Sequence, residues 1–118
     1  MTPLHLAALF KSSATVVSTL IEAGANVDAL DSFQMSPLHW ASIENPAVVP
    51  VLIGAGCKVN LLNDNQRSPL YCAALLSKDR SAVAALMSAA ADPHLGRSPL
   101  TDSAVSDEMK DYIRSLSK

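Results

Sequence analysis

The sequence is poor in aromatic residues and in charge, and each shortage excludes a class of protein. Aromatic residues make up only 4% of the 118 residues, so small aliphatic side chains must supply most of a core. Charged residues make up 17%, against about 25% in typical soluble domains. Because the net charge is -2, the chain has no surplus of lysine and arginine for a phosphate backbone, and we expect no nucleic-acid partner.

Cysteine and long apolar runs are also scarce. Two cysteines, Cys57 and Cys72, are too few for a disulfide scaffold. No apolar run reaches the ~20 residues that span a bilayer, and the first residues lack the pattern of a secretory signal. We therefore expect reduced thiols, no membrane insertion and a location in the cytoplasm or nucleus. The apolar fraction of 49% suffices for one domain, and 118 residues are too few for two independent cores.

A four-residue motif recurs along the whole sequence, at intervals of 34, 32 and 30 residues. Its copies are Thr2-Pro3-Leu4-His5, Ser36-Pro37-Leu38-His39, Ser68-Pro69-Leu70-Tyr71 and Ser98-Pro99-Leu100-Thr101. A second motif follows the first three copies, at residues 23–28, 55–60 and 89–94. Two motifs that recur in register at this period indicate a stack of repeating units.

The motifs resemble those of ankyrin-repeat proteins, whose unit of about 33 residues carries a Thr-Pro-Leu-His-x-Ala signature. The resemblance implies a mainly α-helical solenoid, in which stacked helix-turn-helix units are joined by short β-hairpin loops. It implies one domain, residues 1–118, with units at about residues 1–30, 31–62, 63–94 and 95–118. The first unit lacks its leading hairpin arm, and the last has the pattern of a capping repeat.

The signature predicts where the first helix of each unit begins. Its Ser or Thr accepts a hydrogen bond from an N–H group of the first turn, and its Pro has no N–H to leave unpaired. We expect His5 and His39 to bond Thr2 and Ser36 or nearby backbone, in a structural role. Because Tyr71 replaces histidine in the third copy, we expect no shared catalytic use of this position.

Some positions depart from the family pattern. The turns at residues 31–34 and 63–66 end in Gln34 and Gln66, where the family has glycine. Asn65 is the residue that we expect to take the positive φ in the second turn, and the first turn has no obvious one. Pro50 predicts that the second helix of the second unit either starts near Val48 or bends.

The two ends of the array are predicted to differ. Leu4, Leu6 and Leu9 would lie near an uncovered N-terminal face, so we expect self-association there or missing repeats of a longer array. The last helix, from about Ser106 or Asp107, has one apolar and one charged side, as a native C-terminal cap should. The apolar side consists of Met109, Tyr112, Ile113 and Leu116.

The sequence offers no pattern of catalytic chemistry. The segment Gly54-Ala55-Gly56 lacks the Gly-Lys-Ser/Thr that completes a phosphate-binding loop. Cysteine and histidine do not occur at zinc-ligand spacing, and no ordered nucleophile–base triad is legible. The prediction is a protein that is not an enzyme and has no metal site and no cofactor.

The predicted function is protein–protein interaction, as an adaptor, a scaffold or an inhibitory subunit that binds a protein or peptide. In this family the variable contact positions are the hairpin tips and the exposed side of the first helix. In this sequence they correspond to Phe33, Met35, Ile43, Glu44, Asp64, Asn65, Arg67, Leu75 and Leu76. The alternative for Phe33 and Met35 is that they fold back on the adjacent hairpin, and for Trp40 we favour packing between units over partner contact.

Two further interpretations stay open. The array could be the regulatory part of a larger protein whose catalytic domain is absent from this sequence. Alternatively, it could be a substrate: Asn60 follows Val59 at the position where ankyrin hairpins are hydroxylated. Lys58 replaces the acidic residue often found two positions before that asparagine, which weakens the second interpretation.

Overall fold

The structure is a computed structural model that describes residues 1–118 except 11, 77–79, 97, 101 and 117–118. The described ranges contain seven α-helices, one 3-10 turn and no β-strand. The helical segments are α1 (Pro3–Leu9), α2 (Ala14–Glu22), α3 (Pro37–Glu44), η1 (Pro46–Val48), α4 (Val49–Gly54), α5 (Pro69–Leu76), α6 (Ser81–Ser88) and α7 (Asp107–Leu116). None of these helices is long and apolar enough to cross a membrane.

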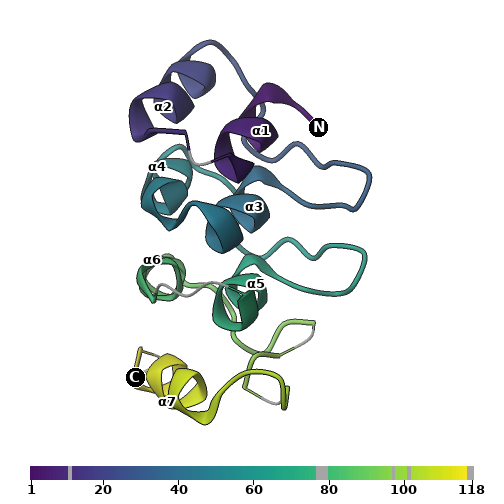
Figure 1. Cartoon of the computed structure of the whole chain (residues 1–118), viewed down its shortest axis with the longest axis vertical. Helices are drawn as coiled ribbons and strands as arrows, with labels where there is room; N and C mark the ends of the chain where they lie inside the picture. Colours follow the sequence, from purple (N-terminus) through teal and green to yellow (C-terminus); the bar gives the residue numbers. More distant parts are fainter. Residues whose placement is uncertain (11, 77–79, 97, 101, 117–118) are drawn as a thin grey trace.

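The molecule measures 40 × 25 × 21 Å along its principal axes. The helices stack in two columns along the longest of these axes (Figure 1). In one column α1 packs on α3 and α3 packs on α5. In the other column α2 packs on α4, α4 packs on α6 and α6 packs on α7. Long loops project from the side of the first column (Figure 1). This arrangement is the α-helical solenoid that the sequence predicts, with loops of hairpin shape where the sequence predicts β-hairpins.

The signature residues begin the first helices as expected. The hydroxyls of Thr2 and Ser36 accept hydrogen bonds from the backbone N–H groups of His5 and His39, and each histidine side chain bonds back to the N-cap backbone. These reciprocal bonds form a capping box and satisfy N–H groups that the helix leaves unpaired. Pro50 lies in the first turn of α4, so the prediction of a late start near Val48 is confirmed.

The prediction that Asn65 takes the positive φ is wrong. Among the described residues other than glycine, those with positive φ are Gln34 (φ 59), Gln66 (φ 62) and Ala90 (φ 66). The N–H groups of Gln34 and Gln66 donate to the carbonyl oxygens of Asp31 and Asn63, each at 3.0 Å. The position in the turn therefore imposes the left-handed conformation, although a residue with a Cβ adopts it at a cost.

The fourth copy of the signature does not begin a helix in the described residues. Wherever the structure describes it, the segment from Ser98 to α7 consists of turns, a bend and irregular backbone. The hydroxyl of Ser98 donates to the carbonyl oxygen of Pro93, and the side chain of Asp102 accepts from the N–H of Ala104. An aspartate that bonds the backbone two residues on stabilises a turn at the expense of a helix.

The predicted difference between the two ends appears in the burial of equivalent residues. Val16 and Val48 occupy equivalent positions of the repeat, because each precedes its glycine, Gly24 or Gly56, by the same number of residues. Val16 is 46% exposed, whereas Val48 is fully buried. At the predicted N-terminal face, Leu6 is exposed and Leu9 is half-buried, whereas Leu4 is buried and belongs to the core.

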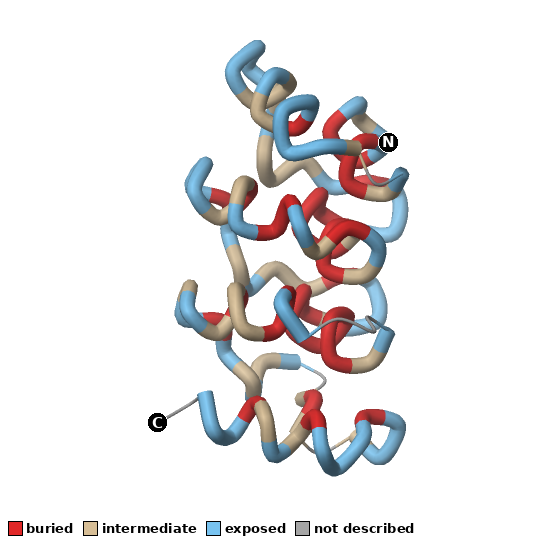
Figure 2. Tube along the Cα trace, turned by 60° about the vertical axis from the view of Figure 1, so that its left-hand side comes forward, coloured by how far each residue is buried: buried red, intermediate tan, exposed pale blue. Residues whose placement is uncertain are grey.

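At the other end α7 begins at Asp107, as predicted. Its side toward α6 buries Met109 and Ile113, while Tyr112 is half-buried and Leu116 is exposed. Figure 2 shows how buried residues gather where helices face one another.

Candidate functional site

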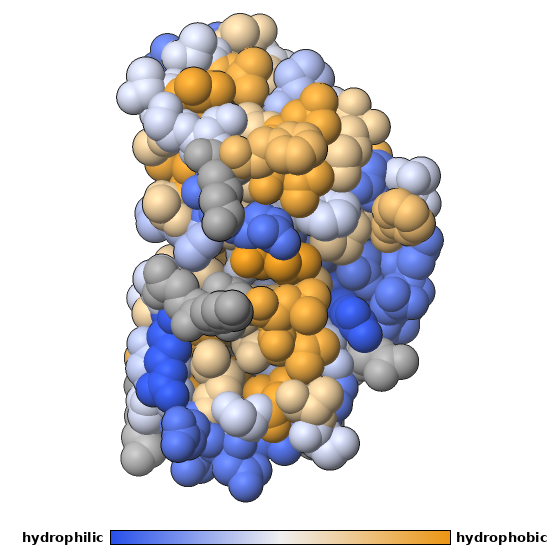
Figure 3. Space-filling view, in the orientation of Figure 1, coloured by the Kyte–Doolittle hydropathy of each residue, from blue (hydrophilic) through white to orange (hydrophobic). Residues whose placement is uncertain are grey.

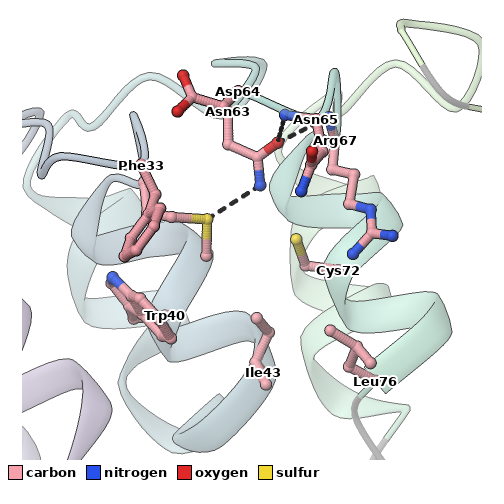
Figure 4. A pocket seen from close by; sticks show the side chains of 10 residues that line it. Phe33, Trp40, Ile43, Asn63, Asp64, Asn65, Arg67, Cys72 and Leu76 are labelled. Atoms are coloured by element: carbon pink, nitrogen blue, oxygen red, sulfur yellow. Dashed lines mark hydrogen bonds between the residues drawn. The ribbon is translucent and has the colours of Figure 1, made fainter.

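A groove of about 500 Å³ lies between two loop tips and the helices α3 and α5 (Figure 4). Its walls come from loop residues 31–35 and 63–67 and from the exposed sides of the two helices. The residues that line it are Phe33, Met35, Trp40, Ile43, Asn63, Asp64, Asn65, Arg67, Cys72 and Leu76. Apolar side chains gather over the column of α1, α3 and α5, beside hydrophilic loops (Figure 3).

Two equivalent side chains shape the loop tips. One oxygen of Asp31 accepts hydrogen bonds from the N–H groups of Phe33 (2.9 Å) and Met35 (3.0 Å). In the next loop Asn63 occupies the same position, and its amide oxygen accepts from the N–H groups of Asn65 (2.9 Å) and Arg67 (3.1 Å). A side chain that replaces backbone acceptors in this way fixes a tight turn without a strand ladder.

Asp31 also positions the tryptophan of the groove. Its second oxygen accepts a hydrogen bond from the indole N–H of Trp40 at 2.9 Å. Burial opposes ionisation of Asp31, but the hydrogen bonds from Trp40, Met35 and Phe33 outweigh it and lower the pKa of this carboxyl group below its usual value. An ionised Asp31 therefore holds the indole ring against the wall of the groove.

The two loop tips contact each other. The N–H of Asp64 donates to the carbonyl oxygen of Phe33 at 3.1 Å. The side-chain amide of Asn63 donates to the sulfur of Met35 at 3.0 Å, which ties this methionine to the neighbouring loop. Met35 is only 6% exposed, so for this residue the fold-back alternative is right and the expectation of an exposed contact is wrong. Phe33 remains 64% exposed.

Buried histidines hold successive units in register. The Nε2 atom of His5 lies 2.9 Å from the carbonyl oxygen of Met35, and that of His39 lies 2.9 Å from the carbonyl oxygen of Arg67. Since carbonyls only accept and the Nδ1 atoms face backbone N–H groups, Nε2 carries the proton in both rings. Burial lowers the pKa of His39 and favours this neutral form. The predicted structural role of both histidines is confirmed.

The structure brings most of the predicted contact residues together. Seven of them line the groove, namely Phe33, Met35, Ile43, Asp64, Asn65, Arg67 and Leu76. Glu44 and Leu75 lie outside it; Glu44 is exposed at the end of α3, and Leu75 packs against the core. For Trp40 the alternatives are packing between units and partner contact. Its side chain packs against the core and also lines the groove.

Sequence reasoning missed Asn63 and Cys72 in the lining and the part that Asp31 plays. A signal was present for the loops, because Asp31 and Asn63 begin equivalent turns and such residues often organise turns with their side chains. No comparable signal marked Cys72, whose place depends on how α5 lies against the loop.

The cysteines have the character of buried apolar residues. Burial raises the pKa of the Cys57 thiol to about 11 and that of the Cys72 thiol to about 12. A thiol with such a pKa is protonated at neutral pH and is a poor nucleophile. Among the residues that the structure describes, no three His, Cys, Asp or Glu side chains are placed to hold a metal ion.

Asn60, the residue considered for hydroxylation, lies outside the groove. It is exposed, and its side-chain oxygen accepts a hydrogen bond at 2.9 Å from the N–H of Asp92 in the next loop. An enzyme that modified Asn60 would have to displace this bond or act around it.

Comparisons with known proteins agree with this architecture. The family model described as "Ankyrin repeats (3 copies)" matches residues 1–61. The crystal structure of the human ASB11 ankyrin repeat domain superposes with a TM-score of 0.83 at 28% sequence identity. The match covers 98% of this chain and 53% of that chain, so the present chain spans about half the length of that structure. A search of curated protein sequences gave no match.

Proposed function

Because this chain belongs to the ankyrin-repeat family, whose repeats are protein-interaction modules, we propose that it binds another protein or a peptide in the groove beside α3 and α5. Binding itself would be its function, with the chain serving as an adaptor, a scaffold or an inhibitory subunit. The human ASB11 domain is similar to this chain in fold.

The observation that carries the proposal is a groove with apolar walls and a polar rim. Phe33 and Leu76 are 64% and 49% exposed, and they lie close to the half-buried Trp40 and Ile43. Asp64, Asn65 and Arg67 add polar groups beside them. Protein-binding surfaces have this composition, because a few large apolar side chains supply most of the binding energy and a polar rim surrounds them.

The groove is also held in shape by internal hydrogen bonds. Asp31 fixes the ring of Trp40, and His39 ties the start of α3 to the backbone of Arg67. Binding would therefore require little further ordering of this surface, and the lower entropic cost favours affinity at a given contact area.

A matched pair of leucine variants tests this proposal. Leu76 in the groove is 49% exposed and Leu30 outside it is 45% exposed, so a change to aspartate should perturb folding to a similar degree. The wild type, Leu76→Asp and Leu30→Asp would each be used as bait in affinity capture from cell lysate, with mass spectrometry of the captured proteins. We expect Leu76→Asp to lose specific partners that the wild type and Leu30→Asp retain.

Trp40 gives an independent readout, since it is the single tryptophan of the chain and lies in the groove. Binding of a captured partner should change its fluorescence, provided that the partner itself lacks tryptophan or carries a non-fluorescent analogue. Equal capture by all three baits, with no change in Trp40 fluorescence, would place the contact surface elsewhere on the array.

A second candidate function is favoured by the exposed N-terminal face. Val16 is 46% exposed where its equivalent Val48 is buried, so the face could seat a further repeat or a second copy of the chain. In this alternative the array positions or restrains a catalytic domain within a larger protein. Immunoblotting of the endogenous protein discriminates the two, because a mass far above 12.4 kDa would favour the larger protein.

A further inference from the structure

Arg67 places a cation in the groove, and its surroundings indicate what kind of partner segment the groove would take. Among the residues that the structure describes, Arg67 is the only Lys or Arg that lines the groove. Its backbone is fixed from two sides, because its N–H donates to Asn63 and its carbonyl oxygen accepts from His39. The side chain therefore starts from a well-defined place at the rim. The inference below rests on the proposed function of the groove.

Arg67 differs from the other arginines that the structure describes. Arg80 lies 3.8 Å from a carboxylate oxygen of Glu108, and Arg114 lies 3.3 Å from one of Asp111. Arg67 has no such ion pair with a described residue, and its buried Nε atom has no hydrogen-bond partner. A partly buried guanidinium group without a carboxylate is an unfavourable arrangement that a bound anion would relieve.

Two described carboxylates in this part of the fold have hydrogen-bond partners of their own. Asp31 is bound to Trp40, and the carboxylate of Asp102 accepts from the hydroxyl of Tyr71. Asp64 lines the same groove, but Figure 4 shows its carboxylate at the loop tip and the Arg67 guanidinium on the side of α5. The guanidinium lies over the ring of Tyr71, 5.3 Å from its centroid, which favours one orientation of the cation.

A carboxylate suits this site better than a phosphate group. The planar guanidinium fits the two oxygens of a carboxylate with parallel hydrogen bonds. Phosphate-recognition sites usually gather several arginines, whereas the described part of the lining contributes Arg67 alone. The neighbouring wall is apolar, with Ile43 and Leu76 on facing helices (Figure 4).

We propose that the groove binds a segment of a partner protein in which a large apolar side chain lies next to an Asp or Glu. The apolar side chain would fill the space beside Trp40, Ile43 and Leu76. The carboxylate of its neighbour would pair with the guanidinium group of Arg67, and Asp64 would disfavour a second acidic residue near the loop tip.

Selection from a library of random peptides tests this preference. The peptides are displayed with their C-termini fused to the carrier, so that only side chains supply carboxylates, and the full chain is the target. We expect peptides selected by the wild type to be enriched in Asp or Glu adjacent to Leu, Phe or Trp, relative to the input library. Arg67→Glu should lose the acidic preference, whereas the matched control Arg114→Glu outside the groove should keep it.

A synthetic peptide from the selected pool then measures the pair directly. Replacing its Asp or Glu by the amide should weaken binding to the wild type at least about tenfold, and should change binding to Arg67→Gln little. An effect of the peptide change that depends on Arg67 in this way shows that the peptide carboxylate and Arg67 interact. If Arg67→Glu fails to fold, as judged by circular dichroism, Arg67→Gln replaces it in the selection, because it removes the charge without reversing it.

The outcomes separate this inference from the function on which it rests. Selected peptides that compete at the groove and are blocked by Leu76→Asp, but show no acidic preference, would overturn the role of Arg67 and leave the binding function intact. If no peptide is enriched on the wild type beyond the level seen with Leu76→Asp, both proposals fail.

Discussion

The first two junctions between units and the last one use the same position of the repeat in different ways. His5 and His39 lie at this position in α1 and α3, and each bonds a backbone carbonyl of the next loop. Tyr71 takes the position in α5, and its hydroxyl donates to the carboxylate of Asp102. The first arrangement depends only on backbone that every unit has, whereas the last needs a particular acidic side chain.

The difference extends to the elements that follow. After the histidine junctions a complete helix pair is built, with α3 and α4 or with α5 and α6. After the tyrosine junction the described segment forms turns until α7, a single helix with a charged outer side. The contrast suggests that the histidine–carbonyl bond propagates the repeat, while the tyrosine–aspartate bond ends it.

The largest effect should come from the apolar contact of the last junction. Ile113 in α7 is fully buried, so Ile113→Ala should lower the free energy of unfolding by about 2–5 kcal/mol, through lost burial and a cavity. Leu116→Ala on the same helix, at a residue 37% exposed, is the control and should cost much less. Urea unfolding measures both, and equal costs would show that α7 does not depend on this contact.

Breaking a histidine junction should cost about 2–3 kcal/mol. In His39→Ala the carbonyl of Arg67 and the N–H of buried Ser36 both lose their partner, and unpaired buried polar groups are unfavourable. His94→Ala, at an exposed histidine, should stay within about 0.5 kcal/mol of the wild type. A cost below about 1 kcal/mol for His39→Ala in thermal unfolding would contradict the role given to this bond.

Breaking the tyrosine junction should cost less, about 1 kcal/mol. Tyr71→Phe keeps the buried ring and removes only the hydroxyl that donates to Asp102. Because Asp102 is half-buried, water can take the place of the hydroxyl. Thermal unfolding of Tyr71→Phe beside His39→Ala compares the two kinds of junction, and a larger loss for Tyr71→Phe would reverse the order proposed here.

Acid should weaken the histidine junction at His39. The pKa of His39 in the folded chain is lowered by burial from its ordinary value of 6.5, so the unfolded chain binds more protons in the window below 6.5. The free energy of unfolding should therefore fall as the pH drops from 6.5 toward the folded pKa.

The lowered pKa of Asp31 acts only in a more acidic window, where its stabilising effect is lost below pH 3.8. Urea unfolding at a series of pH values measures the dependence, which should be reduced in His39→Gln. An unchanged slope in that variant would assign the dependence to another group.

The smallest effect should be a gain from relieving the left-handed residues. Gln34→Gly removes a Cβ from a residue with φ 59, and Gln66→Gly does the same in the next loop. Each should stabilise the fold by about 0.5–1 kcal/mol, the balance between relieved strain and the greater flexibility of glycine when unfolded. Asn65→Gly, beside them but without a positive φ, should not stabilise, and differential scanning calorimetry can rank the three.

Much of the fold could be predicted, because each unit repeats local signals. The Ser or Thr cap, the proline of the first turn and the histidine bond depend on residues a few positions apart, and they occur as expected at Thr2 and Ser36. The fourth copy at Ser98 shows the limit of this reasoning, since the turn formed by Asp102 outweighs the helix start.

The groove was harder to predict, because its shape depends on contacts between units. Met35 is buried by an amide that the next loop provides, and nothing within its own unit indicates this. Cys72 reaches the lining only because α5 lies beside the loop tips. Positions within one repeat did not indicate that Leu75 would pack against the core, or which neighbours would close over the loop tips.

The exposed valine at the beginning of the array has a practical consequence for protein engineering. Val16 on α2 is exposed, whereas Val48 and Ala82, at the equivalent positions of the next two units, are buried. A designed helix pair fused in front of Thr2 would meet an apolar seat that is already shaped for it. Such an extension would lengthen the recognition surface without altering any residue that now lines it.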